Sequence, residues 1–373
     1  MAIDKIGSAA ITDSAVTSAK VASGVLQPNF RNIIINGDMN IAQRTTSKSS
    51  ITGNGYHTID RYKTNLSSAG TWTQSQSTTV PTGQGFAKSL KMDCTTADGS
   101  LGASDYLYIE QNIEGQFLQY LKKGTSSAES TTLSFWVRSN KTGTYIASIK
   151  DNDNTRMINQ SYTISSADTW EKKTITFAGD TTGTLGNDNA TSFRLILWLA
   201  AGSDYTSGTL STSWASQTNA NLAVGQVNLA DSTDNEWYIT GIQLEAGTSA
   251  TDFEFLPFDV NLMRCQRYYY LHNAGMSLDV GVGGYYNGSQ IFLNVQFPTS
   301  MRTSPSLEQV TGSAYYSMYR QNTADDFNSL TLGQKNENMV SLYNNSEVSG
   351  TAGDAGFVRT NNSSTRVAFG AEL

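Results

Sequence analysis

Hydrophobic and polar residues alternate in many short stretches between residues 31 and 258. Alternation places every second side chain on one face of a β-strand, and clusters of Gly, Asn, Asp, Ser and Thr between the stretches mark turns. No long segment with a helical period separates them, which excludes a βαβ architecture. The pattern predicts an antiparallel β-sandwich over 31–258. The clearest alternating sets are Leu107/Ile109, Leu133/Phe135/Val137, Ile175/Phe177 and Phe193/Leu195/Leu197/Leu199.

A second domain is predicted for residues 259–373, because the composition changes near residues 257–262. All six tryptophans precede this point, whereas half of the 18 tyrosines follow it. Pro257 and a possible N-cap at Asp259 come before the best short-helix candidate, residues 260–268. Alternation then resumes in 290–297 and 365–369. We therefore expect a short helix followed by a smaller C-terminal β domain.

Residues 1–30 carry a different pattern, in which an aliphatic residue recurs at every fifth position. A period of five matches neither a helix face nor a strand face, so one chain alone cannot bury these side chains. Three chains wound about a common axis can bury them, which predicts a homotrimer with an extended N-terminal segment. The alternative is a flexible linker rich in Ala, Ser and Thr. The recurring residues are Ile6, Ile11, Val16, Val21 and Leu26.

Composition and charge exclude several classes of protein. The formal net charge is −7 and no run of Lys and Arg occurs, so we expect no nucleic-acid partner. No apolar stretch approaches 18 residues, and the N-terminus lacks the pattern of a signal peptide, so we expect neither membrane insertion nor a cleaved leader. The two cysteines, Cys94 and Cys265, are far apart in sequence and are interpreted as reduced and structural.

The sequence contains no complete motif for a metal or cofactor site. The segment Asp151–Asn154 imitates the start of an EF-hand loop, but Arg156 and Tyr162 occupy the positions that require Gly and Glu. Two histidines are too few for a histidine metal site or a Ser/His/Asp triad. We expect no cofactor, and the sequence leaves a metal site undecided.

Three stretches of the chain form an ordered series. The first is the repeat around residues 11–21. The second is Asn32–Arg44 with Tyr56–Tyr62, which, paired with Ile242–Gly247, is similar to the first and last strands of carbohydrate-binding-module-like jelly rolls. The third runs from Arg264–Tyr270 through Phe297–Pro305 to Ala368–Leu373. In this order the three stretches resemble a tail fibre or receptor-binding protein of tailed bacteriophages.

This resemblance implies a trimeric component of the virion tail that is made in the cytoplasm of the bacterial host. The N-terminal segment would attach to a tail adaptor or nozzle protein, and the distal β domains would bind a host surface receptor, in the first place a glycan. Jelly rolls of this kind often hold a structural calcium near their joined ends, where Asp38 and Glu245 are the matching positions.

Candidate glycan-binding residues lie on the strand faces opposite the aliphatic ones. Aromatic rings stack on the apolar face of a sugar, and Arg donates hydrogen bonds to its hydroxyls or carboxylates. The alternative is that these rings only pack beneath loops or against another subunit. The candidates on the predicted sandwich are Tyr106 and Tyr108, Trp136 and Arg138, and Arg194 and Trp198.

A second candidate surface comes from adjacent tyrosine pairs in the C-terminal domain. Neighbours in a strand face opposite sides, so at least one of each pair should point outward, for ligand binding or for a trimer interface. The pairs are Tyr285–Tyr286 and Tyr315–Tyr316. Tyr268–Tyr270 follow the predicted helix and are expected to pack the two domains together instead.

Catalysis is not expected. The nearest pair of carboxylates, Glu110 and Glu114, is interpreted as a solvated strand end, and no nucleophile with an adjacent base is recognisable. Two alternatives to a receptor-binding fibre remain open. One is a capsule polysaccharide depolymerase on the tail, and the other is a tail adaptor or decoration protein that contacts no receptor.

Overall fold

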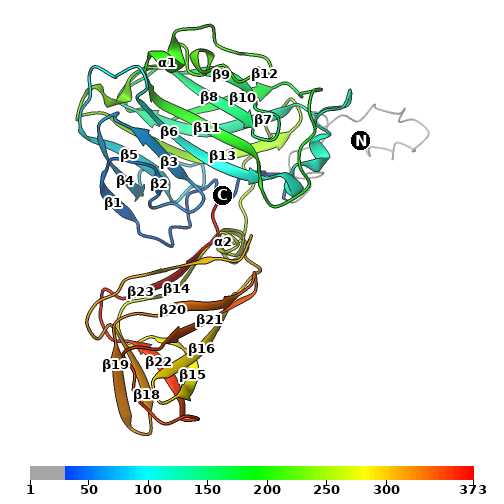
Figure 1. The fold of residues 1–373 in the computed structure, drawn as a ribbon. Helices are drawn as coiled ribbons and strands as arrows, with labels where there is room; N and C mark the ends of the chain where they lie inside the picture. The colour runs from blue at the N-terminus through cyan, green and yellow to red at the C-terminus, as the bar shows by residue number, and fades with distance from the viewer. Residues whose placement is uncertain (1–29) are drawn as a thin grey trace, which may run out of the picture.

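The computed structural model describes residues 30–373, which form two β-rich bodies stacked end to end (Figure 1). Nearly all regular structure is antiparallel β-sheet. The predicted trimer segment with Ile6, Ile11, Val16, Val21 and Leu26 lies outside the described residues, and the homotrimer stays a prediction. Within the described range, no helix is both long and apolar enough to cross a bilayer.

The first body is a sandwich of two antiparallel sheets. The six-stranded sheet has the order β1 (Ser47–Ile51), β4 (Thr71–Ser77), β5 (Ser89–Thr96), β13 (Glu236–Ala246), β7 (Thr131–Ser139) and β10 (Glu171–Phe177). The seven-stranded sheet has the order β12 (Ala215–Ser216), β9 (Arg156–Ile164), β8 (Gly143–Asp151), β11 (Thr191–Ala201), β6 (Tyr106–Glu114), β3 (Lys63–Ser67) and β2 (Gly55–Tyr56).

One hydrophobic core fills the space between these two sheets, and it contains the aliphatic faces that the alternation predicted. Phe135 and Val137 enter it from one sheet, and Ile109 and Leu197 enter it from the other. The predicted sandwich with inward aliphatic faces is therefore confirmed. Short helices lie in the connections: η3 (Gly115–Phe117), η4 (Gln119–Leu121), α1 (Ser203–Thr206), η5 (Asn219–Asn221) and η6 (Leu229–Asp231).

The segment 32–44, which resembled a first strand, forms turns instead. Asn36 and Met39 both have φ 60°, a left-handed conformation that no strand accommodates. The Asn36 side chain bonds the backbone of Ile41 at both its N–H and its C=O, which closes the turn. The segment still lies beside β13, because the Ile33 N–H donates to the Leu244 carbonyl at 2.8 Å. The predicted pairing of the two ends is present without the predicted strand.

The second body begins with helix α2 (Phe258–Gln266), close to the predicted 260–268. Pro257 occupies the N-cap in place of Asp259, which lies in the first turn, where its charge favours the helix dipole. A three-stranded sheet follows, ordered β14 (Tyr269–Ala274), β23 (Arg366–Gly370) and β17 (Ser306–Gln309).

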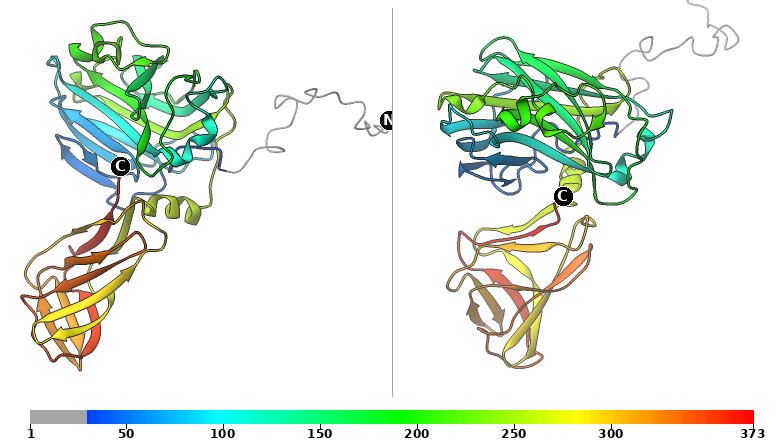
Figure 2. Two further views of the ribbon diagram at one scale, coloured as in Figure 1. Left: turned by 45° about the vertical axis from the view of Figure 1, so that its right-hand side comes forward. Right: turned by 45° about the horizontal axis from the view of Figure 1, so that its top comes forward.

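The remaining strands of this C-terminal domain form a second seven-stranded sheet, whose position below the sandwich is seen in Figure 2. The domain has a hydrophobic core of its own. Val280, Leu293, Leu342 and Val358 are among the residues that fill this core. The strand order is β19 (Thr323–Phe327), β18 (Tyr316–Arg320), β22 (Ala355–Thr360), β15 (Asp279–Asn287), β16 (Gln290–Gln296), β21 (Met339–Asn344) and β20 (Thr331–Lys335).

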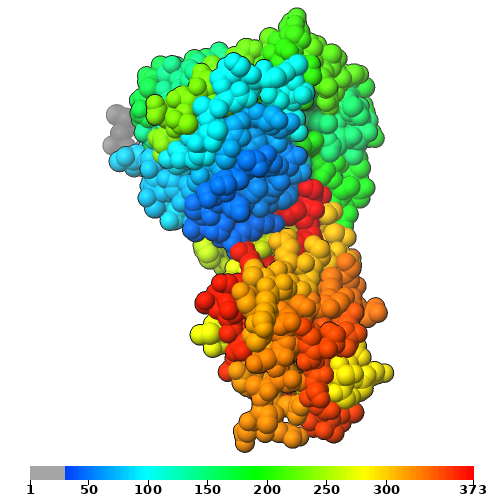
Figure 3. Space-filling model, turned by 60° about the vertical axis from the view of Figure 1, so that its left-hand side comes forward, coloured from blue at the N-terminus to red at the C-terminus, as the bar shows by residue number. Residues whose placement is uncertain are grey.

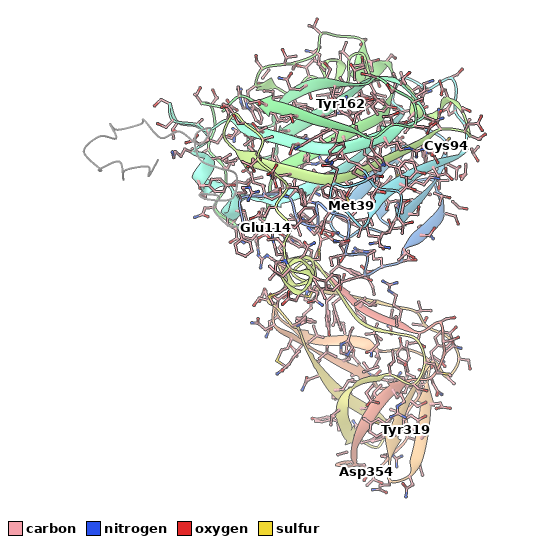
Figure 4. The ribbon with its side chains drawn as sticks, turned by 180° about the vertical axis from the view of Figure 1, so that it is seen from behind. Met39, Cys94, Glu114, Tyr162, Tyr319 and Asp354 are labelled. Atoms are coloured by element: carbon pink, nitrogen blue, oxygen red, sulfur yellow. The ribbon has the colours of Figure 1, made fainter. Side chains whose placement is uncertain are left out.

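Buried charges join the two domains, and the last residues of the chain lie at this junction (Figure 3). Glu114, at the edge of the sandwich beside α2, accepts from Arg267 at 2.7 Å and 2.8 Å and from the hydroxyl of Tyr268 (Figure 4). Arg44 lies over the ring of Tyr269. The prediction that Tyr268 and Tyr269 pack the domains together is confirmed, whereas Tyr270 packs against the core of the C-terminal domain.

Candidate functional site

Four of the predicted residues meet on the outer face of the sandwich's seven-stranded sheet. β6 and β11 are neighbours, and their register places Trp198 opposite Tyr108. The two rings lie 4.9 Å apart, and the ring of Tyr106 lies 5.3 Å from that of Tyr108. Arg194 projects from the same face of β11, four residues before Trp198. The sequence therefore located one aromatic cluster with an adjacent cation.

A connection between β11 and β13 crosses this face and forms a wall over it. Gly202 begins the crossing with its N–H bonded to the Asp105 carbonyl at 2.8 Å. A Cβ at Gly202 would lie 2.0 Å from the Gly102 carbonyl oxygen, so only glycine fits there. Tyr205 of α1 then brings its ring 5.6 Å from that of Trp198 and 5.8 Å from that of Tyr106.

This wall corrects the interpretation of Trp198 as an exposed sugar platform. The Trp198 side chain is only 2% exposed, because Leu222 and Tyr205 of the wall pack over it. Its indole N–H donates to the Ser148 hydroxyl at 3.2 Å. Trp198 is the floor that positions Tyr108 and Tyr205, whose rings are half-buried.

Between floor and wall lies a hollow of about 260 Å³, which we call the sandwich groove. Such a volume is below the roughly 300–1,000 Å³ of pockets for drug-sized ligands, so it suits one or two small rings. Its lining combines aromatic rings, amides and two cations: Tyr106, Tyr108, Lys150, Met157, Arg194, Ile196, Trp198, Tyr205, Gln217, Asn219 and Leu222.

Arg194 is held by a buried carboxylate beneath the groove. Its Nε lies 2.8 Å from Oε2 of Glu110, whose side chain is 0% exposed. The expectation that Glu110 sits at a solvated strand end is wrong, since β3 and β11 flank it on both sides. Burial raises the pKa of the Tyr108 hydroxyl above its usual value, and the nearby Glu110 adds to the rise. Tyr108 therefore offers a neutral hydroxyl to the groove.

Trp136 and Arg138 lie elsewhere, on the outer face of the six-stranded sheet. Arg138 donates to Glu236 at 3.2 Å and to Asp168 at 2.8 Å, and its guanidinium lies 5.0 Å from the ring centre of Tyr238. Trp136 is half-buried on the same strand. The structure therefore does not join these two residues to the sandwich groove.

The tyrosine pairs of the C-terminal domain divide as period-two alternation predicts, with one ring in and one ring further out. Tyr285 is buried and donates to Asp325 at 2.6 Å, and Tyr316 is buried and donates to the Val310 carbonyl at 3.1 Å. Burial leaves no free ring surface on these two candidates. Tyr315 is half-buried against the domain core, whereas Tyr286 is 74% exposed.

Tyr286 is the outward member of its predicted pair and belongs to a wider aromatic surface, here called the tip face, whose other rings were not among the sequence candidates. Its ring lies 5.8 Å from that of Phe292, which lies 5.5 Å from that of Tyr343 across β16 and β21. On the same side of the sheet, the rings of Tyr319 and Phe357 stack at 5.4 Å. Figure 4 places Tyr319 in the part of the C-terminal domain far from the sandwich. Alternation within 290–296 could have predicted the outward position of Phe292.

The positions matched to calcium do not meet in one site. Asp38 accepts from Asn40 at 2.6 Å and from Asn261 at 3.0 Å. Glu245 instead accepts from the N–H and the hydroxyl of Thr251. Over residues 30–373, no group of three or more His, Cys, Asp and Glu side chains is arranged to hold a metal ion.

No protein-family model matches this chain. No curated protein matches it either. Among solved structures, the enzymatically active domain of tailspike protein 4 from bacteriophage CBA120 is similar, with a TM-score of 0.30 and 13% identity over 58% of this chain. The match spans 21% of that tailspike chain.

Carbohydrate-binding modules are also among the similar structures. A family 11 module from Clostridium thermocellum, in complex with a mixed-linked tetrasaccharide, matches with a TM-score of 0.26 and 13% identity, over 55% of this chain and 98% of the module. A family 30 module matches with a TM-score of 0.28 and 11% identity, over 61% of this chain and 91% of the module.

Proposed function

We propose that this chain is a glycan-binding protein and that the sandwich groove holds the sugar. The observation that carries the proposal is the convergence of half-buried Tyr106, Tyr108 and Tyr205 on a small hollow that also contains amides and cations. Tyrosine rings offer flat apolar surfaces to the C–H face of a sugar. Gln217, Asn219 and the guanidinium of Arg194 supply donors and acceptors for its hydroxyls.

The activity is binding without covalent chemistry. The carboxylate of Glu110, which binds the groove residue Arg194, is buried and engaged by it, so it is not free to protonate a leaving group. Glu114, the other carboxylate of β6, is engaged by Arg267 and Tyr268 at the domain junction. Because both carboxylates of β6 are held in ion pairs, the arrangement favours sugar binding over hydrolysis of a glycosidic bond.

We further propose that the protein is a homotrimeric tail fibre of a bacteriophage, with a jelly-roll-like sandwich. The order of the three sequence stretches given above supports this role. The N-terminal segment would attach to a tail adaptor or nozzle protein, and the β domains would bind a glycan on the host surface. Three copies in one fibre would convert weak sugar contacts into useful avidity.

Replacing Tyr205 by alanine is expected to weaken glycan binding about fivefold, because one stacking ring is worth about 1 kcal/mol. Tyr205→Phe keeps the ring and should keep most of the affinity. The matched control is Tyr120→Ala, which removes a tyrosine that is 48% exposed and outside the groove lining. Binding is measured on a glycan array and by titration calorimetry, and thermal unfolding verifies folding. Equal affinity of Tyr205→Ala and Tyr120→Ala would contradict the groove assignment.

The tail-fibre role predicts that the purified chain competes with intact phage for adsorption to host cells. The same preparation should release no reducing ends from host polysaccharide. Release of reducing ends would instead support a capsule depolymerase. A chain that is incorporated into tails but never reduces adsorption would support an adaptor or decoration protein.

A further inference from the structure

Four charged side chains form a row on the outer face of the seven-stranded sheet, and two of them, Lys150 and Arg194, line the sandwich groove. The register places Lys63 opposite Glu110 and Arg194 opposite Lys150, and opposed residues in antiparallel strands share a face. Lys63 Nζ lies 3.8 Å from Oε1 of Glu110, and Arg194 binds the other carboxylate oxygen. The row holds three cations and one carboxylate, so it carries an excess of positive charge.

Lys150 is the cation in this row without a partner. Within residues 30–373, its ammonium makes neither a hydrogen bond nor an ion pair, although the side chain is half-buried between Arg194 and Met157. Burial lowers the pKa of Lys150, and repulsion from Arg194 lowers it further, with partial compensation from Glu110. A partly desolvated cation beside another cation is an unfavourable arrangement that a bound anion would relieve.

The rest of the groove supplies no carboxylate of its own. The lining residues include two cations and no Asp or Glu, although acidic residues outnumber basic ones in the chain by 32 to 25. Asp105 and Asp204 lie close enough to act on the Tyr205 hydroxyl, but neither is among the lining residues. The groove is therefore a locally positive site on an acidic protein.

We propose that the sandwich groove selects an anionic sugar residue, with its negative group against the ammonium of Lys150 and its ring against Tyr106 and Tyr205. This inference rests on the proposed glycan-binding function and adds the class of sugar. A lysine ammonium is a point charge with rotatable donors and lacks the planar fork of arginine, so it can donate to either a carboxylate or a sulfate ester. The sugars that we expect to bind share a pyranose ring that carries a negatively charged substituent.

The experiment compares sugars that differ only in the group at carbon 6, which is charged in one member of each pair and neutral in the other. Glucuronate and galacturonate are titrated by NMR beside their neutral counterparts glucose and galactose. Glucose 6-sulfate is titrated as well, to test whether a sulfate ester binds in place of a carboxylate. We expect each anionic sugar to bind at least about tenfold more tightly than its neutral counterpart, because hydrogen bonds to charged groups are roughly twice as strong as neutral ones. Raising the salt concentration should reduce this preference.

Lysine variants identify the responsible cation. Lys150→Met should abolish the preference for anionic sugars and keep the weak binding of neutral ones, whereas Lys150→Arg should retain the preference. The matched control, Lys48→Met, removes an exposed lysine from β1 of the other sheet and should change nothing. Thermal unfolding verifies that each variant is folded.

The outcomes separate the inference from the function on which it rests. Equal binding of anionic and neutral sugars would overturn the inference and leave glycan binding in place. A preference that survives in Lys150→Met would overturn it as well. Binding of none of the five sugars, even at millimolar concentration, would contradict the proposed glycan function together with the inference.

Discussion

Replacing Arg61 by methionine is expected to lower the free energy of unfolding by about 3–5 kcal/mol, the usual cost of removing one partner from a buried ion pair. Arg61 comes from the sandwich and is 1% exposed. One guanidinium nitrogen binds Glu372 from the end of the chain, and the other donates to the Asn112 carbonyl at 2.7 Å. The guanidinium also lies 3.4 Å from the ring centre of Tyr268.

The loss of stability should appear in both domains, because Arg61 of the sandwich binds Glu372 and packs on Tyr268, which belong to the C-terminal domain. Burial alone would lower the pKa of Arg61, but Glu372 and its neighbours raise it above its usual value, so the side chain remains charged. Methionine fills much of the same volume but leaves Glu372 with Arg44 as its remaining ion-pair partner, at 3.2 Å.

The measurement is urea unfolding followed by tryptophan fluorescence and by far-UV circular dichroism. All six tryptophans belong to the sandwich, so fluorescence reports on that domain, whereas dichroism reports on both. The control is Arg359→Met, since Arg359 pairs with the exposed Asp279 and should cost less than about 1 kcal/mol. Equal losses in the two variants would contradict the assigned role of Arg61.

Replacing Arg194 by methionine is expected to cost about 3 kcal/mol of stability, because it leaves the buried carboxylate of Glu110 without its main partner. Lys63 would remain at 3.8 Å from that carboxylate, which is why the expected loss lies at the lower end of the range. The double variant Arg194→Met/Glu110→Gln should recover most of the stability.

A double-mutant cycle on thermal unfolding measures the coupling between Arg194 and Glu110. We expect a coupling of roughly 2 kcal/mol between two groups in direct contact. Additive losses would show that the ion pair does not hold Arg194 in place, and Arg194 would then be free to serve as a second cation for the ligand.

The strand faces could be predicted from the sequence because period-two alternation is a local property. Phe135, Ile109 and Leu197 face the core as expected, and their outward neighbours include Tyr106, Tyr108 and Arg194. Strand neighbours are not local, so the sequence did not show that β6 and β11 pair while Trp136 lies on the opposite sheet.

The wall of the groove could not be predicted, because residues 202–222 have no regular period. No sequence pattern therefore indicates that Tyr205, Gln217 and Asn219 line the groove, or that this segment buries Trp198. The outward position of Lys150 could have been predicted, because it follows Ile149, which faces the core, on the same strand. The aliphatic run in 32–44 predicts a strand, but the Asn-Gly-Asp turn interrupts that run.

The most direct measurement is a crystal structure of the chain with a bound oligosaccharide that carries a uronic acid. We expect the sugar in the sandwich groove, with a ring against Tyr106 or Tyr205 and its carboxylate within hydrogen-bonding distance of Lys150. A sugar bound on the tip face at Tyr286 and Phe292, with the sandwich groove filled only by water, would contradict the central claim.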